Sequence, residues 1–246
     1  MIRVTNLHKS IGTQQVLRGV NLHVARGETC VVLGRSGCGK SVLLKNLIGL
    51  MKPNSGEVFV EGDDIVHLPE RKLSSIRKKI GILFQSGALF DSMSVEDNIA
   101  FPLREAGMRD QKIIDEKVAE ALEMVNLAGE QKKMPENLSG GMRKRVGLAR
   151  TIVSRPHCIL FDEPTTGLDP IASDSINHLI RRLQKRLEVT SVVVTHDMKT
   201  AFHTADHVAF LHEGRVYFDG TMEGLRASQD TVLQDFIEGR SREDAL

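Results

Sequence analysis

The sequence predicts an α/β fold with a mainly parallel sheet at its core. Four short, continuous apolar runs are typical of strands that helices cover on both faces. These runs are TCVVL at 29–33, ILF at 82–84, HCILF at 157–161 and SVVV at 191–194. Between them lie stretches with apolar residues at three- and four-residue spacing, such as 115–125 and 175–187, which predict helices. Strands that alternate with helices favour right-handed crossovers.

Two further regions predict additions to this core. Residues 2–8 and 16–24 alternate apolar and polar side chains, which predicts an N-terminal antiparallel β subdomain. Residues 86–155 contain no convincing strand, so we expect a helical insertion subdomain between two strands of the sheet.

The C-terminal part of the chain has a simpler pattern. Residues 207–218 predict a hairpin that turns at Glu213 and Gly214, and residues 229–246 predict a C-terminal helix and a charged, frayed tail. Because no internal repeat or low-complexity linker is present, residues 1–240 are expected to form one domain.

Composition excludes several classes of function. The 246 residues carry 33 Lys and Arg against 32 Asp and Glu, and aromatic residues make up only 4%, so neither a basic field nor a stacking platform for nucleic acid is expected. No secretory signal and no apolar run of membrane-spanning length is evident. Three cysteines in apolar or glycine-rich runs indicate a cytosolic protein.

A glycine-rich loop predicts a phosphate site. The spacing G-x-x-x-x-G-K-[ST] is met by Gly34, Arg35, Ser36, Gly37, Cys38, Gly39, Lys40 and Ser41, with Val42 next. Its main-chain N–H groups and the start of the following helix suit a phosphate, while Lys40 suits the β- and γ-oxygens and Ser41 suits Mg²⁺. Cys38 admits two interpretations: a redox-sensitive thiol, or a slot that takes a small residue, which we favour.

Two acids and a histidine follow apolar strands. Asp162 and Glu163 end the run CILF, and His196 follows SVVVT. Because ligands bind at the carboxyl ends of parallel strands, Asp162 is suited to the Mg²⁺ shell and Glu163 to the attacking water. The imidazole of His196 is suited to a γ-phosphate.

The motif Leu138, Ser139, Gly140, Gly141, Met142 adds a family resemblance. Residues 1–228 resemble the ATP-binding subunits of ABC transporters, whose signature is L-S-G-G-Q. The other motifs follow the order of that family: the loop at 34–41, Gln85 at a strand end, the signature, the acids at 162–163, Gly167-Leu168-Asp169 and His196. The resemblance implies a P-loop ABC ATPase fold. It also implies a two-fold dimer in which LSGGM faces the ATP of the opposite protomer.

The resemblance also implies roles for single residues. Lys40 and Ser41 would grip phosphate and metal, Gln85 and Asp162 would complete the metal site, and Glu163 would be the base. Asp169 would couple the two sites and His196 would clamp the γ-phosphate. Ile11 stands where the family usually has an aromatic residue, so Ile11 and Val16 are expected to contact the adenine.

A subgroup is indicated by FQSGALFDS at 84–92 and SVEDNIAFPLRE after Met93. These segments resemble the ATPases of lipid-trafficking ABC systems, of the maintenance-of-lipid-asymmetry and Mce-associated kind. That implies phospholipid cargo, a permease, a lipid-binding subunit and a peripheral place on the cytoplasmic face of the inner membrane. Leu89, Phe90 and Met93 belong either to a permease groove or to the core of the insertion. The basic run at 143–145 is interpreted as a solvated helix face without a role.

Other functions are weighed against this one. An importer ATPase for another small substrate would carry the same motifs. A soluble ABC ATPase acting on DNA or ribosomes usually has two cassettes, a coiled coil or a basic arm, and none is evident. A regulatory subunit without hydrolysis is disfavoured because Lys40, Asp162, Glu163 and His196 are all present.

Overall fold

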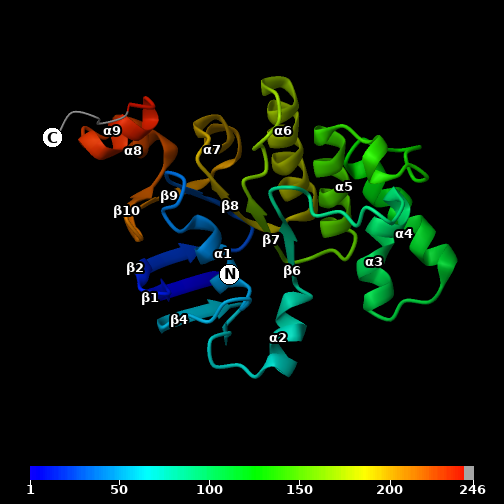
Figure 1. The fold of residues 1–246 in the computed structure, drawn as a ribbon, viewed down its shortest axis with the longest axis horizontal. Helices are drawn as coiled ribbons and strands as arrows, with labels where there is room; N and C mark the ends of the chain where they lie inside the picture. Colours follow the sequence, from blue (N-terminus) through cyan, green and yellow to red (C-terminus); the bar gives the residue numbers. More distant parts are fainter. Residues whose placement is uncertain (241–246) are drawn as a thin grey trace. The chain divides into compact units, whose positions relative to one another are not determined.

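The computed structural model describes residues 1–240, which divide into two compact units. The first unit comprises Met1–Pro69 and the chain from Val192 onward, and the second comprises Glu70–Ser191. The boundary falls inside strand β8 (Thr190–Thr195), all of whose residues are buried. Each unit is described separately (Figure 1).

An antiparallel sheet opens the first unit. Its strand order is β2-β1-β4-β5, and the strands are β1 (Ile2–Ile11), β2 (Gln14–Val24), β4 (Ser55–Val60) and β5 (Asp63–Asp64). Ile2 pairs with Val24 across the β1–β2 hairpin, and both side chains are buried. The alternating pattern at 2–8 and 16–24 therefore predicted the strands correctly, because one face of each is buried and the other is solvated.

Further strands of this unit include β3 (Thr29–Leu33), which leads into the glycine-rich loop. This strand is wholly buried and runs parallel to β9 (His207–His212), which forms a hairpin with β10 (Arg215–Gly220). The turn lies at Glu213 and Gly214, as predicted. The helices are α1 (Lys40–Leu47), α7 (Met198–Thr204), α8 (Met222–Ala227) and α9 (Thr231–Ile237). The end of the expected tail, 241–246, lies outside the described residues.

The second unit combines two parallel strands with a group of helices. β6 (Ile80–Leu83) runs parallel to β7 (Cys158–Asp162). The helices are α2 (Glu70–Arg77), α3 (Val95–Glu105), α4 (Gln111–Met124), α5 (Gly140–Ile152) and α6 (Pro170–Leu187), with a 3₁₀ turn η1 at Pro135–Asn137. Between β6 and β7, all described residues lie outside strands, as the helical insertion predicts.

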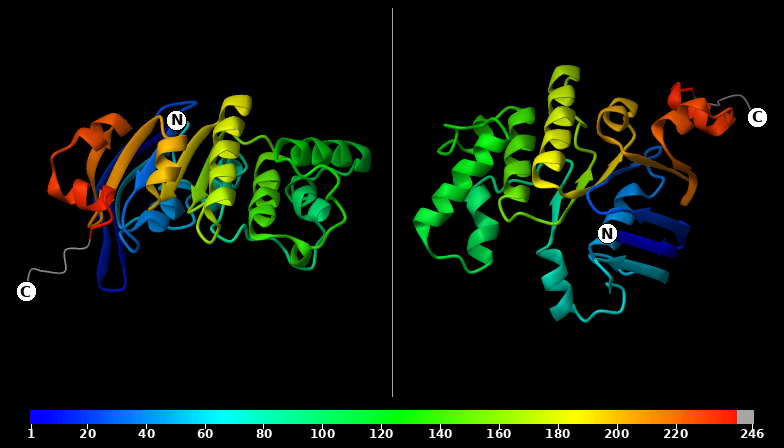
Figure 2. Two further views of the ribbon diagram at one scale, coloured as in Figure 1. Left: turned by 90° about the horizontal axis from the view of Figure 1, so that it is seen from above. Right: turned by 180° about the vertical axis from the view of Figure 1, so that it is seen from behind.

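Capping side chains explain where these helices begin. Ser94, Asp110, Ser139 and Asp169 each accept a hydrogen bond from a main-chain N–H in the first turn of the helix that follows. Helices α3, α4 and α5 pack against one another and lie side by side in both views of Figure 2. No helix in residues 1–240 is long and apolar enough to cross a lipid bilayer.

Candidate nucleotide-binding site

The glycine-rich loop of the first unit connects buried strand β3 to helix α1. Gly39 is the N-cap of α1 and has a φ of 109°, a left-handed conformation that strongly favours glycine. Its carbonyl oxygen accepts the first helical bond, from Leu43 N at 2.8 Å. The loop therefore ends on a helix start, where the positive end of the helix dipole favours an anion.

Lys40 lies inside this loop. Its side chain is buried, with 6% of the residue exposed, and Nζ donates to Gly34 O at 2.8 Å and to Arg35 O at 3.1 Å. The ammonium thus lies against the main chain of the loop, so its charge is positioned for a phosphate held by the same main chain.

The other predicted phosphate and adenine residues also lie in the first unit. Arg35, Ser36 and Gly37 are exposed, while Cys38, Ser41 and Val42 are half-buried. Val16 reaches the loop, because a Cβ built on Gly39 would lie 3.1 Å from Val16 Cγ1. Ile11 ends β1 with 50% of its surface exposed. The structure thus brings Val16 to the phosphate loop and leaves Ile11 on the surface.

His196 directly follows β8, as its sequence position predicts. It is exposed and precedes Asp197, which caps α7 by accepting from Lys199 N. The rigid strand on one side and the capped helix on the other fix the main chain of His196. Its catalytic role remains a prediction.

The two acids lie at the carboxyl end of β7 in the second unit. Asp162 is the last residue of the strand, and Glu163 follows with a φ of 49°. Both side chains are half-buried, and Thr166 Oγ1 donates to Glu163 Oε2 at 3.3 Å. A non-glycine residue in the left-handed region costs about 1 kcal/mol or more, so the surrounding contacts must hold Glu163 in this conformation.

Gln85 lies two residues beyond the end of β6, in a turn, and its side chain is exposed. Its carbonyl oxygen accepts a hydrogen bond from Lys144 Nζ. The structure therefore places Gln85 slightly past the strand end where the sequence pattern predicted it.

The LSGGM motif forms the N-terminus of α5. Ser139 Oγ accepts from Met142 N at 3.3 Å, Leu138 is buried, and Ser139 and Gly140 are exposed. A Cβ on Gly140 would lie 3.4 Å from Leu168 Cδ2, so the residues before α6 lie beside the motif.

Asp169 caps α6. Its Oδ1 accepts from Ile171 N and Ala172 N, both at 2.9 Å. Ile171 itself is 84% exposed, which is unusual for a large apolar side chain. The Gly140–Leu168 contact therefore places an exposed apolar residue near the exposed motif.

The interpretation of residues 143–145 as a solvated helix face is wrong. Lys144 is only 4% exposed, and Arg145 donates to Val125 O at 2.8 Å and to Ser175 Oγ at 2.6 Å. Arg143 remains exposed, with its Nε donating to Leu138 O at 3.3 Å. The reason is that α5 packs against α3, α4, α6 and β6, which leaves little of its circumference to solvent.

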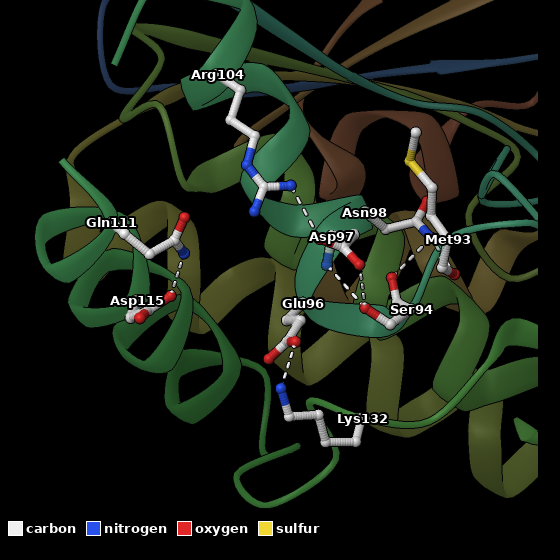
Figure 3. Close-up of polar contacts among 9 residues, drawn as sticks. All are labelled: Met93, Ser94, Glu96, Asp97, Asn98, Arg104, Gln111, Asp115 and Lys132. Atoms are coloured by element: carbon white, nitrogen blue, oxygen red, sulfur yellow. Dashed lines mark hydrogen bonds and ion pairs between the residues drawn. The ribbon is translucent and has the colours of Figure 1, made fainter. Parts of the chain in front are cut away.

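The segment after Gln85 is held by a buried asparagine that sequence reasoning missed. Asn98 Nδ2 donates to the carbonyl oxygens of Phe90, Met93 and Ser94, at 3.1, 3.0 and 3.0 Å, and Oδ1 accepts from Phe90 N at 2.9 Å. Figure 3 shows Asn98 beside Met93 and Ser94 at the start of α3. An asparagine four residues after a capping serine is the only local signal for this role.

The sequence left two interpretations open for Leu89, Phe90 and Met93: a permease groove or the core of the insertion. Leu89 and Met93 are half-buried, while Phe90 is 42% exposed. The Phe90 ring lies 4.9 Å from the Phe101 ring, centroid to centroid. Phe90 therefore packs on the insertion and also presents an apolar edge to solvent.

Comparison with known proteins agrees with the motifs. Residues 17–166 match the ABC transporter family. The chain is 42% identical to the intermembrane phospholipid transport system ATP-binding protein MlaF of Haemophilus influenzae, over 98% of this chain and 91% of that protein. It is also 42% identical to a probable ribonucleotide transport ATP-binding protein, mkl, of Mycobacterium leprae, over 97% of this chain and 69% of that protein.

A solved structure extends the likeness to three dimensions. The dimeric, post-hydrolysis state of the ATP-binding cassette MJ0796, bound to ADP and Pi, has a TM-score of 0.82 and 31% identity, over 90% of this chain and 99% of that chain. Family match, sequence identity and fold agree: the chain belongs to the ABC transporter family as one of its ATP-hydrolysing cassettes.

Proposed function

We propose that this cassette powers a transporter that moves phospholipid between the inner and outer membranes. It would act at the cytoplasmic face of the inner membrane, with a permease and a lipid-binding subunit. Support comes from MlaF, named for intermembrane phospholipid transport, and from the segment at 84–105. The equally similar mkl is named for ribonucleotide transport, which favours an importer of another small substrate as the alternative.

The observation that carries ATP binding is the loop from Gly34 to Ser41. Lys40 lies buried against main-chain carbonyls of a loop that ends on a helix N-terminus, which is the arrangement expected for a bound triphosphate. The remaining contacts are proposed for Val42, Val16 and Ile11, with Val16 and Ile11 facing the adenine.

Hydrolysis is assigned to residues of both units by role. Glu163 would accept the proton of the attacking water, His196 would hold the γ-phosphate, and Gln85 would sense the nucleotide. Ser41, Gln85 and Asp162 offer hydroxyl, amide and carboxylate oxygens, the hard donors that suit Mg²⁺. The metal would neutralise charge on the β- and γ-phosphate oxygens.

A second copy of the chain is the proposed partner for catalysis. Ser139 and Gly140 are exposed at the start of α5, where N–H groups suit a phosphate from another protomer. Ile171 is 84% exposed beside the capping Asp169, the residue proposed to couple the two sites. A dimer that buries Ile171 would remove this apolar surface from water.

We keep residues 1–240 as one ATP-binding domain, with the helical subdomain at about 86–155 and the C-terminal helix after 229. This is the arrangement in which a single chain contributes half of each composite site.

The experiment that tests hydrolysis is Glu163→Gln in the full chain. Removal of the base is expected to lower steady-state ATP turnover by about 100-fold or more while ATP still binds. ATP should also drive the variant to a dimer on size-exclusion chromatography, and Ile171→Asp should abolish that dimer. Wild-type turnover by Glu163→Gln would remove Glu163 from the role of base.

The cargo is tested by what the chain purifies with. Isolation from its native membrane is expected to recover an integral membrane subunit and phospholipid. Recovery of a permease that binds a ribonucleotide or another small solute, without lipid, would overturn the phospholipid assignment.

A further inference from the structure

Lys144 is the buried cation of the second unit that the proposed function does not use. It lies one turn into α5, beyond Ser139, and 4% of it is exposed. Its Nζ donates to the carbonyl oxygen of Gln85, and a longer contact of 3.4 Å joins it to the carbonyl oxygen of Glu163. One ammonium thus contacts the main chain of two predicted site residues that lie far apart in the sequence.

A buried lysine needs polar groups around its ammonium. Burial lowers the pKa of Lys144 below its ordinary value, and the negative charges of Glu163 and Asp162 offset only part of this effect. Taking an ammonium out of water is costly unless polar groups replace its hydration. Here the replacements include two main-chain oxygens, so the position of Lys144 and the positions of those carbonyls depend on one another.

The main chain at both contacts needs support. Glu163 has a φ of 49°, which its neighbours must maintain, and the ammonium of Lys144 attracts its carbonyl oxygen. The turn after Gln85 is held by the same helix, because Arg150 Nη2 donates to Gly87 O at 2.9 Å. A Cβ on Gly147 would lie 3.0 Å from the same Gly87 oxygen.

We infer that Lys144 is a positioning residue for ATP hydrolysis: it fixes the main chain of Gln85 and Glu163 against helix α5, and so holds the Glu163 carboxylate where the reaction needs it. The inference rests on the proposed roles of Glu163 and Gln85. The hydrogen bond from Lys144 to the carbonyl oxygen of Gln85 also joins the LSGGM helix to the loop that follows β6.

The test compares Lys144→Met with Arg145→Met in the full chain. Arg145 is the matched control, because it lies on the same helix and donates to a main-chain carbonyl, that of Val125. Both variants are expected to lower the thermal midpoint. Only Lys144→Met is expected to lower kcat, by about 10- to 100-fold, the range that follows from losing a charged hydrogen bond. Its affinity for ATP should stay within about threefold of wild type, since binding rests on the other unit.

Two further variants separate positioning from stability. Lys144→Arg retains the charge and the donors, and is expected to recover most of the kcat lost in Lys144→Met. Should Lys144→Met not fold, Lys144→Gln takes its place, and its amide should still leave kcat about fivefold or more below wild type.

Coupling to Glu163 is tested in the Glu163→Gln background, by single-turnover hydrolysis. Because Lys144 acts through Glu163, adding Lys144→Met there should cost less than about twofold. Equal kcat losses in Lys144→Met and Arg145→Met, or full additivity with Glu163→Gln, would overturn the inference. Normal turnover by Glu163→Gln would instead overturn the proposed function on which it rests.

Discussion

Gly34 offers the sharpest test of the phosphate loop, because the structure leaves no room for a larger residue there. A Cβ at this position would lie 2.5 Å from Leu211 O and 2.6 Å from Cys38 Sγ, whereas real Cβ atoms essentially never approach closer than 3.0 Å. Leu211 is fully buried in strand β9 and cannot easily yield. In Gly34→Ala the loop itself must therefore move, by about 0.5 Å or more.

The expected consequences follow from that movement. Overpacking costs about 1–3 kcal/mol, which lowers the thermal midpoint by about 2–12 °C in a chain of this size. The displaced loop would make weaker charge-assisted hydrogen bonds to the triphosphate, and a loss of about 1.4 kcal/mol there corresponds to about a tenfold loss of ATP affinity.

The control is Gly27→Ala, in a turn of the same unit. Gly27 has a φ of 74° and nothing within 4 Å of a built Cβ, so the variant meets conformational strain without overlap. It should lose about 1–2 kcal/mol of stability and keep its ATP affinity. Thermal unfolding and titration with a fluorescent ATP analogue measure both quantities. Wild-type affinity in Gly34→Ala, at a clearly lowered midpoint, would refute the assignment of this loop to the phosphates.

Three further predictions concern the second unit. Ser139→Ala removes the cap on Met142 N and should cost about 1 kcal/mol in urea unfolding, while Ser139→Thr should not. Asn98→Ala removes the four hydrogen bonds of a buried amide and should lower the free energy of unfolding by about 2–4 kcal/mol. The loop after β6 should also be cleaved faster by a protease, and an unchanged cleavage rate would contradict the role of Asn98 in holding that loop. The hydrogen bond from Arg104, then that from Ser94, lowers the pKa of Asp97 below its usual 3.8. The stability this adds is present above that value and is lost as the pH falls through the folded pKa. Asp97→Asn should therefore be less stable than wild type by about 0.5 kcal/mol or less at neutral pH, and the two should converge in acid.

Much of the fold could be predicted because its signals are local. TCVVL coincides with β3 residue for residue, since a wholly buried strand has to be apolar throughout. β4 escaped prediction because only Val58 and Val60 of its side chains are fully buried, which leaves too short an alternation to recognise. β1 continues to Ile11, past the apolar pattern, because main-chain pairing in the hairpin does not need buried side chains.

The site residues, like the strands, could be predicted where their signals are local in the sequence. The glycine-rich loop that ends at Gly39 is a run of consecutive residues, so its spacing located it, whereas Ser139 and Asp169 were singled out by the family resemblance. Lys144 was misjudged because its carbonyl partner at Gln85 lies 59 residues away. A basic residue on a helix usually faces solvent, and only the packing of α5 shows that this one does not.

The turn after Gln85 has an inner side, which hydrogen bonds join to α5, and an outer side that exposes an aromatic ring. On the inner side, Lys144 and Arg150 hold the carbonyls of Gln85 and Gly87 against α5. On the outer side, Phe90 keeps 42% of its surface exposed, although the Arg150 guanidinium lies 5.7 Å from its ring centroid. A change at Phe90 is therefore expected to alter the exposed surface without moving the main chain of Gln85, because the hydrogen bond from Lys144 that holds that main chain comes from α5. The outer side can therefore differ between relatives named for phospholipid and for ribonucleotide transport, each 42% identical to this chain, without loss of the hydrogen bonds on the inner side.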